Sequence, residues 1–379
     1  MTAALELNVS KTDYNVLEVF TEEWRQIMAG EERLAKLIYL ICTSRLLDRP
    51  MHAVIKGPSG AGKSEIRKQV LKFFPSEDVI SLTAMSEKAL IYAPQDFRHV
   101  ILSMAEATAK KSRGLQDLLL REMMSDGRFS YSVKGRGLFS ETITKEGPCA
   151  FLITTTLDAL NPENENRMLS LHVDDSPIQT RRVLRKLAED MDDDSPVLDH
   201  LPLWHQYQRR LRMILSDIER ITVPFGCVLG DMVPASHRRI RRDFGHLLTA
   251  IKAHALLQHE HRINKDGQLL ADLTDYGAVR DLLVDVFADP DMQPTMRETL
   301  KALAEIQPDI GGVTALQLAR HLGISKSAAL RRLQDAVREC LVINQERRRG
   351  QPGRYRTDDE VLNPLPTAEK VAAAWRARR

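Results

Sequence analysis

One segment of this 379-residue chain has the spacing G-x-x-x-x-G-K-S. Its eight residues are Gly57, Pro58, Ser59, Gly60, Ala61, Gly62, Lys63 and Ser64. Glycines at these positions let a loop curl until backbone N–H groups point inward at phosphate oxygens, while the lysine reaches the outer phosphates and the serine hydroxyl ligates Mg²⁺. The apolar run HAVIK precedes the loop and EIRKQVLKFF follows it, so a helix N-terminus would face the anion. The pattern predicts a site for ATP and Mg²⁺, with Lys63 as a catalytic cation and Ser64 as the metal ligand.

A second apolar run, HVILSMAEAT (99–108), ends at Glu106. A glutamate at the end of a strand beside the phosphate loop is placed to activate the attacking water, and we assign Glu106 as that catalytic base. The aspartate that usually precedes such a glutamate is missing, because Ala105 stands there. Mg²⁺ would then depend on Ser64, on the phosphates, and on Glu106 through water. The alternative is that Glu106 is a solvated helix residue.

A third apolar run, CAFLITTT (149–156), ends in three threonines. Polar residues at the carboxyl end of a parallel strand lie at the ligand-binding edge of such a sheet. We therefore expect a hydroxyl, most simply that of Thr155, to touch the γ-phosphate or the attacking water. The alternative is that threonine is present only for its preference for strands.

The segment 52–160 alternates short apolar runs with helical patterns, which predicts a doubly wound, mostly parallel α/β sheet. Residues 14–48 read as helices, the acidic stretch 189–196 as a boundary loop, and 203–288 as almost entirely helical. We expect five segments: an N-terminal helical segment (1–50), a P-loop core (51–190), a helical lid (191–290), a winged-helix domain (291–357) and a tail (358–379).

Composition limits the class of protein. Charged residues make up 28% and aromatic residues 5% of the chain, and the formal net charge is +2. No apolar run approaches the roughly 20 residues that cross a bilayer, and the start lacks the pattern of a secretory signal. The four cysteines are far apart without metal-ligand spacing. We expect no membrane contact and a cytoplasmic location.

The C-terminal part is strongly basic: residues 320–356 include ten Lys and Arg residues and only three acidic ones. The pattern there is helix, turn, helix and hairpin, with Ser325 as the cap of the second helix and Ala328, Leu330 and Leu333 in its packing face. This predicts a winged helix whose second helix enters a DNA major groove and whose wing meets phosphates. The expected contacts are Lys326, Ser327, Arg331 and Arg332 on the helix, and Arg347, Arg348, Arg349, Arg354 and Arg356 on the wing. A winged helix that docks on protein is the alternative.

Taken together, these blocks resemble an AAA+ ATPase, and among these the MCM-like helicases of mobile elements and prophages. The order of the blocks matches: LLREMMSDGRFSYSV (119–133), SYSVKGRGLFSETITKEGP, CAFLITTT, NRMLSLHVDDS (166–176) and SHRRIRRDFGHLLTAIKAHA (236–255). The chain also resembles the helicase halves of Toprim primase–helicases, over roughly residues 33–357. It departs from ordinary MCM proteins at Ala105 and in having no N-terminal OB or zinc domain.

The resemblance implies further roles. Arg167 corresponds to the arginine finger, which completes the ATP site of a neighbouring subunit, and Arg242 corresponds to the sensor-2 arginine. Lys134 and Arg136 would form the tip of a hairpin that grips single-stranded DNA in a pore, although the same residues suit a solvated turn. The expected assembly is a homo-oligomer, most simply a hexamer, and a primase on another chain is a further expected partner.

The resulting hypothesis is an ATP-dependent DNA helicase or translocase that acts in replication of a mobile genetic element or phage. Two alternatives stay open: a helicase loader or origin-binding initiator ATPase, and a DNA-binding regulator that uses ATP as a switch. A defence-system ATPase with the same core is compatible with the sequence as well.

Overall fold

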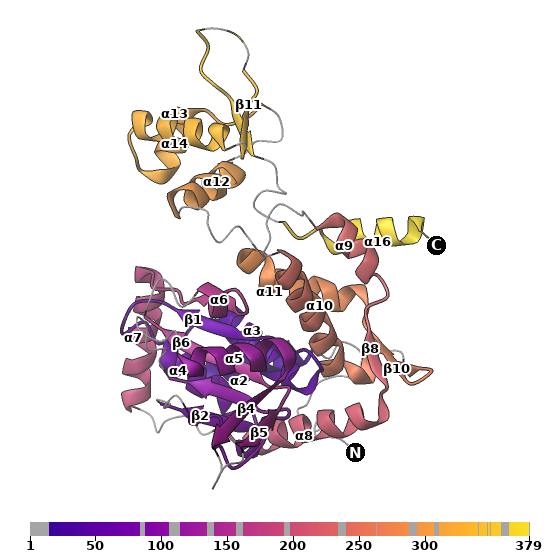
Figure 1. Cartoon of the computed structure of the whole chain (residues 1–379). Coiled ribbons are helices and arrows are strands. Elements are labelled where there is room, and N and C mark those ends of the chain that lie inside the picture. The colour runs from indigo at the N-terminus through magenta and orange to yellow at the C-terminus, as the bar shows by residue number, and fades with distance from the viewer. Residues whose placement is uncertain are drawn as a thin grey trace. The chain divides into compact units, whose positions relative to one another are not determined.

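The computed structural model describes most of the chain. The described residues are 15–83, 88–105, 114–134, 140–156, 162–192, 198–233, 240–262, 264–287, 294–306, 311–339, 341–346, 348, 350–357 and 364–378. They form two compact units, one of residues up to 227 together with 235–282, the other of 228–234 together with 283–379 (Figure 1).

The first unit is built on a five-stranded parallel sheet. In spatial order its strands are β2 (Val79–Leu82), β3 (Ile101–Met104), β6 (Ala150–Thr155), β1 (Ala53–Lys56) and β7 (Leu169–His172). Every residue of β1, β3 and β6 is buried. This burial explains why these strands read as continuous apolar runs, and it confirms the predicted doubly wound α/β fold.

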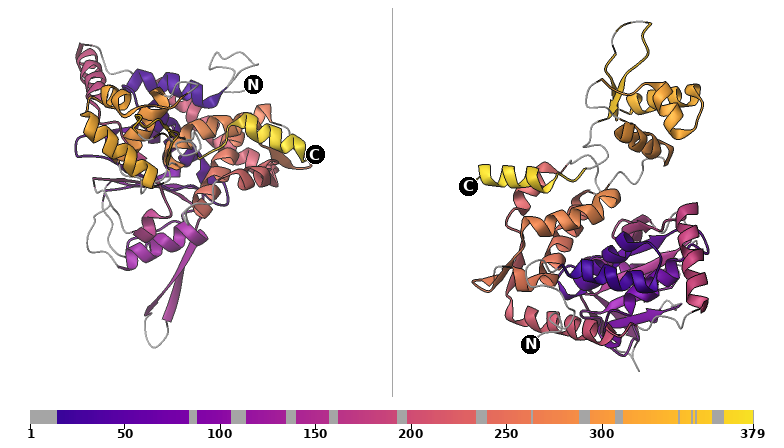
Figure 2. Two further views of the ribbon diagram at one scale, coloured as in Figure 1. Left: turned by 90° about the horizontal axis from the view of Figure 1, so that it is seen from above. Right: turned by 180° about the vertical axis from the view of Figure 1, so that it is seen from behind.

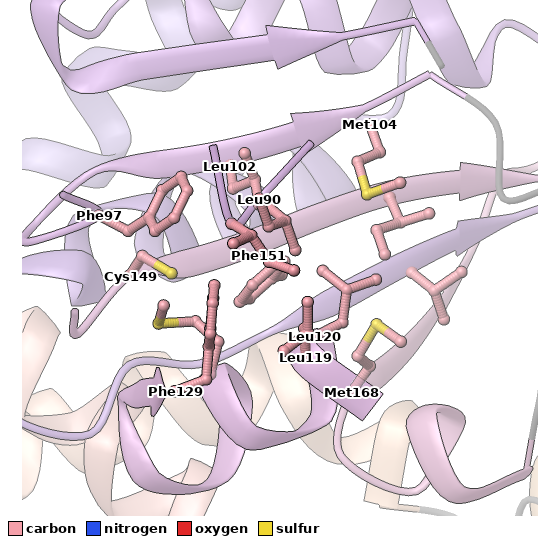
Figure 3. Packing of buried hydrophobic residues seen from close by; sticks show 14 residues of the cluster. Leu90, Phe97, Leu102, Met104, Leu119, Leu120, Phe129, Cys149, Phe151 and Met168 are labelled. Carbon is pink, nitrogen blue, oxygen red and sulfur yellow. The ribbon is translucent and has the colours of Figure 1, made fainter. Parts of the chain in front are cut away.

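Helices cover both faces of the sheet. On one face, α5 (Leu115–Asp126) packs Leu119, Leu120 and Met123 against side chains of the strands, among them Phe151 (Figure 3). On the other, α3 (Glu32–Thr43) and α4 (Lys63–Leu71) contact β6. The helix α2 (Val16–Ile27) then packs on α3, with Phe20 and Trp24 fully buried. The sheet is therefore sandwiched, as a doubly wound core requires.

A long hairpin leaves the sheet between α5 and β6. Its strands, β4 (Arg128–Lys134) and β5 (Ser140–Glu146), pair antiparallel over seven residues each, and Figure 2 (left) shows them as a projecting arm. The expected hairpin is thus present. Its tip, including Arg136, lies outside the described residues, and Lys134 is the last residue of β4.

One predicted loop is partly helical. After the short α6 (Pro162–Glu165) and β7, the helix α7 runs from Pro177 to Asp192, so residues 189–192 belong to a helix and not to the expected boundary loop. Pairs spaced by four residues, Arg185 with Glu189 and Lys186 with Asp190, support the last turns of this helix.

The lid region contains a small sheet that the helical prediction missed. Its helices are α8 (Leu201–Asp217), α9 (Gly226–Met232), α10 (Ile240–Leu257) and α11 (Leu273–Phe287). Between them, β8 (Arg220–Thr222), β10 (Gln268–Leu270) and β9 (Asn264–Lys265) form a three-stranded sheet. The fully buried Asp275 at the start of α11 accepts hydrogen bonds from Arg262 and lies 2.7 Å from His254 of α10, which joins the two helices.

Within the described residues, the second unit includes a module of three helices and a hairpin. They are α12 (Pro294–Ile306), α13 (Ala315–Leu322), α14 (Lys326–Arg338), β11 (Val342–Asn344) and β12 (Tyr355–Thr357), and Val313 forms a bridge to Tyr355. The hydroxyl of Ser325 caps α14 by accepting from the Ala328 N–H, as predicted. The predicted packing face of α14 was correct for Leu333, which is buried together with Ala329 and Ala336, and wrong for Leu330, which is exposed.

The C-terminal helix α16 (Ala368–Ala377) belongs to the same unit. Thr367 caps it, Val371 is buried, and Arg378 forms an ion pair with Asp231 at the end of α9. Among the described helices of the chain, none is long and apolar enough to cross a membrane.

Candidate nucleotide site and its surroundings

A pocket of about 410 Å³ lies at the carboxyl edge of the parallel sheet. Its lining residues are Ser59, Gly60, Gly62, Lys63, Ser64, Glu65, Ala105, Thr154, Thr155 and Thr156. Three sequence blocks predicted separately, the G-x-x-x-x-G-K-S loop, the strand ending at Ala105 and the threonine-ended strand, therefore meet at one place. Because β1, β3 and β6 are parallel neighbours, their carboxyl ends share one edge.

The loop adopts a conformation that requires glycine at particular positions. Gly57 passes so close to Val173 that a Cβ there would lie 2.4 Å from the valine methyl carbon. Gly62 has a φ of 82° and stands immediately before the first helical residue of α4, where no side chain caps the helix. The N–H groups of the first turn of α4 are therefore open toward the pocket, the arrangement that binds phosphate at a helix N-terminus.

Lys63 lies in the wall of the pocket. Only 7% of it is exposed, and its Nζ donates to the carbonyl oxygens of Gly57 (2.8 Å) and Pro58 (2.6 Å). An ammonium group has three N–H donors, so one remains for a phosphate oxygen. The charge of Lys63 is thus held at the loop by neutral partners, and a triphosphate would supply the opposite charge.

The pocket suits Mg²⁺ that is held mainly through phosphate. The Ser64 hydroxyl stands at the start of α4, and Mg²⁺ commonly takes one or two protein oxygens together with phosphates and waters. In the described part of the chain, no cluster of three His, Cys, Asp or Glu side chains could hold a metal alone. Ala105 occupies the wall where a second acidic ligand would stand, and the assigned base Glu106 lies outside the described residues.

The three threonines have different surroundings. The hydroxyl of Thr154 donates to the backbone oxygen of Ala105, which ties β6 to the end of β3. Thr155, the expected catalytic threonine, lines the pocket but is 1% exposed. Thr156 lines the pocket and is exposed, so its hydroxyl is better placed to meet a γ-phosphate or water. The sequence analysis favoured Thr155, whereas the exposure of the three side chains favours Thr156.

Behind the loop, Arg67 of α4 is a buried cation that the sequence analysis did not single out. Its guanidinium donates to the Ser103 hydroxyl of β3, and no carboxylate is bonded to it among the described residues. Burial lowers the pKa of Arg67. The side chains of a helix lean toward its N-terminus, so this positive charge is directed toward the phosphate-binding end of α4.

Arg167 is far from the pocket of its own chain. It stands two residues before Leu169 of β7, which pairs with Ala53 of β1, whereas the loop begins at Gly57. Along the strand direction, Arg167 and Gly57 are therefore six residues apart, which is roughly 20 Å at about 3.3 Å per residue in a parallel sheet. Arg167 therefore lies at the amino edge of the sheet and the loop at the carboxyl edge, and an arginine side chain does not span that distance.

Arg167 belongs to a cluster of three arginines in the first unit. Its Nε donates to the Ser125 hydroxyl (2.7 Å) and its Nη1 to the Glu163 carbonyl oxygen (2.5 Å). Burial lowers the pKa of Arg167, and the positive charges of Arg242 and Arg121 lower it further. Arg121 forms an ion pair with the Glu163 carboxylate. The structure thus brings the two predicted arginines, Arg167 and Arg242, to one place and adds Arg121.

The predicted DNA contacts are distributed unequally. Lys326, Ser327 and Arg331 on α14 are exposed, whereas Arg332 forms an ion pair with Glu298 of α12 at 2.7 Å. On the hairpin, Arg348, Arg354 and Arg356 are exposed, and the Arg354 guanidinium also donates to the Gly311 carbonyl oxygen. Arg347 and Arg349 lie outside the described residues.

Comparison with known families agrees with the nucleotide site. A family model described as the MTBMA_p00010 P-loop domain matches residues 9–196. A comparison with curated protein sequences finds no match.

Three solved structures resemble the chain at low scores. A candidate ATPase from Cytophaga hutchinsonii has a TM-score of 0.46 at 14% identity and covers 76% of this chain and 88% of its own. A full-length MCM homolog from Methanopyrus kandleri has a TM-score of 0.42 at 17% identity, and the match covers 75% of this chain and 64% of the homolog. The Thermotoga maritima RuvB Holliday junction branch migration motor has a TM-score of 0.31 at 15% identity, and the match covers 92% of this chain and 95% of the motor. Because the scores are low, residue roles here rest on this chain's own geometry.

The parallel sheet, the glycine loop before α4 and the family match over residues 9–196 define the class of the protein. It contains a P-loop domain with a doubly wound α/β fold.

Proposed function

We propose that this protein is an ATP-driven DNA helicase or translocase that works as a ring of identical subunits in the replication of a mobile genetic element or phage. One observation supports this proposal most: within one chain, the phosphate loop is far from the arginines that an ATPase site needs. The pocket around Lys63 contains no arginine among its lining residues, while Arg167 and Arg242 cluster at the opposite edge of the sheet. A second copy of the chain is needed to bring the two together.

Within such a shared site the roles follow from position. Lys63 and the first turn of α4 bind the phosphates, and the Ser64 hydroxyl holds Mg²⁺, which neutralises phosphate charge when bound. Glu106 activates the water and Thr155 or Thr156 orients it. Arg167 of the next subunit stabilises the charge that develops on the γ-phosphate. Arg242, which is close to Arg167, would reach the phosphate from the same subunit.

The DNA-binding parts are the β4–β5 hairpin and the C-terminal module. The order helix, bridge, helix, helix, strand, strand from α12 to β12 is that of a winged helix, with α14 as the recognition helix. In the sequence, Lys134 and Arg136 lie where β4 ends and before β5 begins, and two glycines flank Arg136. We assign the hairpin to single-stranded DNA in the pore and the winged helix to duplex DNA.

The helix α7 supports assembly of the chain with copies of itself. It is a 16-residue helix that presents Leu184, Leu187 and Met191 along one side, 62%, 56% and 88% exposed, and it lies at the margin of the first unit (Figures 1 and 2). An apolar stripe of this extent marks an interaction surface. Since α7 follows β7, whose end touches the phosphate loop through Val173 and Gly57, the neighbour that completes the ATP site would lie beside it.

Replacing Leu184 and Leu187 together by glutamate is expected to dissociate the assembly. The charges would have to be buried against the neighbour, although both positions are exposed in the single chain and the fold has no need of them. Sedimentation should report a monomer, and ATP turnover should fall by on the order of 10³-fold because the arginine in trans is lost. ATP affinity should stay unchanged.

The matched control is Met213→Glu, a single exposed methionine (70%) on α8 that is outside the stripe. It should keep both the assembly and the turnover. If the double variant remained assembled, α7 would not be part of the interface between subunits.

The experiment that tests the proposed function measures ATP turnover and fork unwinding together. Turnover should rise with single-stranded DNA, and the wild-type protein should displace a strand from a forked duplex. Lys134→Ala with Arg136→Ala should abolish unwinding while duplex binding falls only modestly, since the winged helix still holds the duplex.

Two other results would change the assignment. A double hairpin variant that unwinds forks at the normal rate would show that the hairpin tip is a solvated turn. If the wild type hydrolyses ATP and binds DNA without displacing a strand, the protein is an initiator, a loader or a switch and no helicase.

A further inference from the structure

We infer that helix α14 reads DNA sequence, with Arg331 and Gln334 as its base-contacting residues and Leu330 as an apolar contact to thymine. The inference rests on the proposed DNA-binding function of the winged helix and deepens it, because phosphate contacts alone would give affinity without a preferred site. It turns on three properties of α14: which side faces outward, which outward side chains are free, and how they are spaced.

The outward side of α14 is set by its packing. Ala329, Leu333 and Ala336 are buried in the core of the module. With 3.6 residues per turn, the opposite side carries Ser327, Arg331, Gln334 and Arg338, all of which are exposed. Leu330 lies at the margin of this side and is 37% exposed. Leu330 is not among the residues that form or pack against the core of the module, and it is suited to an apolar contact.

Hydrogen bonds then separate the outward side chains into two groups. Arg338 is held by Asp335 of its own helix at 2.6 Å, and the neighbouring Arg332 is held by Glu298 at 2.7 Å. Within the described part of the chain, the side chains of Arg331 and Gln334 have no hydrogen bond or ion pair. A side chain that reads a base edge must offer its full set of donors and acceptors, and only these two long side chains of the outward stripe do so.

The spacing of the free side chains fits a major groove. Ser327, Leu330, Arg331 and Gln334 stand at positions 0, 3, 4 and 7 of one helix. That is the spacing with which the third helix of homeodomains reads bases. Arg331 and Gln334 are three residues apart, about 4.5 Å along the helix axis, which brings them to neighbouring base pairs.

The chemistry of these side chains defines the site. Arginine donates two hydrogen bonds to O6 and N7 of guanine, glutamine exchanges two with N6 and N7 of adenine, and an apolar side chain contacts the thymine methyl group. The exposed Arg348 and Arg356 of the β11–β12 hairpin would meet phosphates on either side and fix the register. We therefore expect a short recognition sequence with a guanine next to an adenine or a thymine.

The test is selection from a randomised duplex library with the full-length chain, followed by binding measurements on the selected sequence and on a scrambled one. The wild type should enrich a defined sequence and bind it at least about 10²-fold more tightly than the scrambled duplex. Gln334→Ala should lose preference at one position and weaken binding to the selected duplex by about 10-fold or more, with binding to the scrambled duplex unchanged. Since Gln334 is uncharged, the salt dependence of binding should stay the same.

Three companion variants sharpen the outcome. Arg331→Ala should remove the guanine preference at a second position, whereas Arg338→Ala, the matched arginine tied to Asp335, should leave the selected sequence intact. Arg348→Ala should weaken binding to both duplexes alike and lower the slope of log affinity against log salt by about one.

The outcomes distinguish this inference from the function on which it rests. DNA binding with no enriched sequence, or an enriched sequence that survives both Gln334→Ala and Arg331→Ala, overturns base reading and leaves the DNA-binding function standing. Absence of any DNA binding overturns both.

Discussion

Arg167→Ala is expected to reduce ATP turnover by on the order of 10³-fold while ATP binding stays at the wild-type level. The guanidinium lies at the amino edge of the sheet, and its own chain's phosphate loop is at the carboxyl edge. It therefore contributes nothing to binding in the isolated chain. In the proposed shared site its effect would fall on the charge that develops on the γ-phosphate bound by the neighbouring subunit, which changes turnover and not affinity.

A mixing experiment tests whether this arginine acts in trans. Arg167→Ala subunits keep an intact loop, and Lys63→Ala subunits keep an intact Arg167, so some interfaces of a mixed assembly contain both. Turnover of the mixture should exceed that of either variant alone. Arg220→Ala, an exposed arginine of β8, is the control and should leave turnover unchanged.

Two results would contradict a shared site. If mixed assemblies form, as shown by differently tagged subunits that purify together, and turnover is not restored, Arg167 does not act across an interface. If Arg167→Ala hydrolyses ATP at the normal rate, another arginine completes the site, with Arg242 the first to examine because its charge lies close to Arg167.

The sheet could be predicted from sequence because its central strands are buried on both sides. Runs such as AVIK and AFLITT carry apolar or small residues at nearly every position, and a parallel sheet covered by helices requires that. The small sheet of the lid could not be predicted in the same way. Its strands Arg220–Thr222 and Gln268–Leu270 are three residues long, shorter than any window in which alternation can be recognised.

The arginine cluster depended on tertiary structure. Arg121, Arg167 and Arg242 come from α5, the turn before β7, and α10, and nothing in their spacing along the chain relates them. The resemblance assigned roles to two of them, whereas their proximity and the presence of Arg121 came from the fold. In the same way, only burial distinguished Arg67, which lies on a helix where a charged residue normally faces solvent.

Helix α14 illustrates how a small error in a pattern alters a site. The sequence pattern placed Ala328, Leu330 and Leu333 in the packing face; Leu333 is buried, but its buried neighbours are Ala329 and Ala336. A shift of one residue turns a helix by about 100°. The correction moves Leu330 to the outward margin and brings Gln334 and Arg338, which the sequence analysis had not considered, into the expected DNA face.

Lys63→Ala is expected to weaken ATP binding by at least about 100-fold and to abolish turnover. A hydrogen bond to a charged group contributes about 1.5–3 kcal/mol, and Lys63 would supply one such bond together with the main positive charge at the outer phosphates. The fold itself should tolerate the change, because the ammonium group bonds only to the carbonyl oxygens of Gly57 and Pro58 and no buried carboxylate would lose its partner. Loss of binding can then be separated from loss of folding.

Thermal unfolding measures ATP binding and the stability of the fold in one experiment. A ligand that binds only the folded state raises the unfolding temperature, so wild-type protein should show a rise with ATP that grows with its concentration. Lys63→Ala should unfold near the wild-type temperature without ATP and show no rise with it. Lys68→Ala, an exposed lysine on the same helix, should behave as the wild type. A Lys63→Ala protein that is still stabilised by ATP to the wild-type extent would mean that the loop and the first turn of α4 bind the phosphates through backbone N–H groups alone, with Lys63 acting only in hydrolysis.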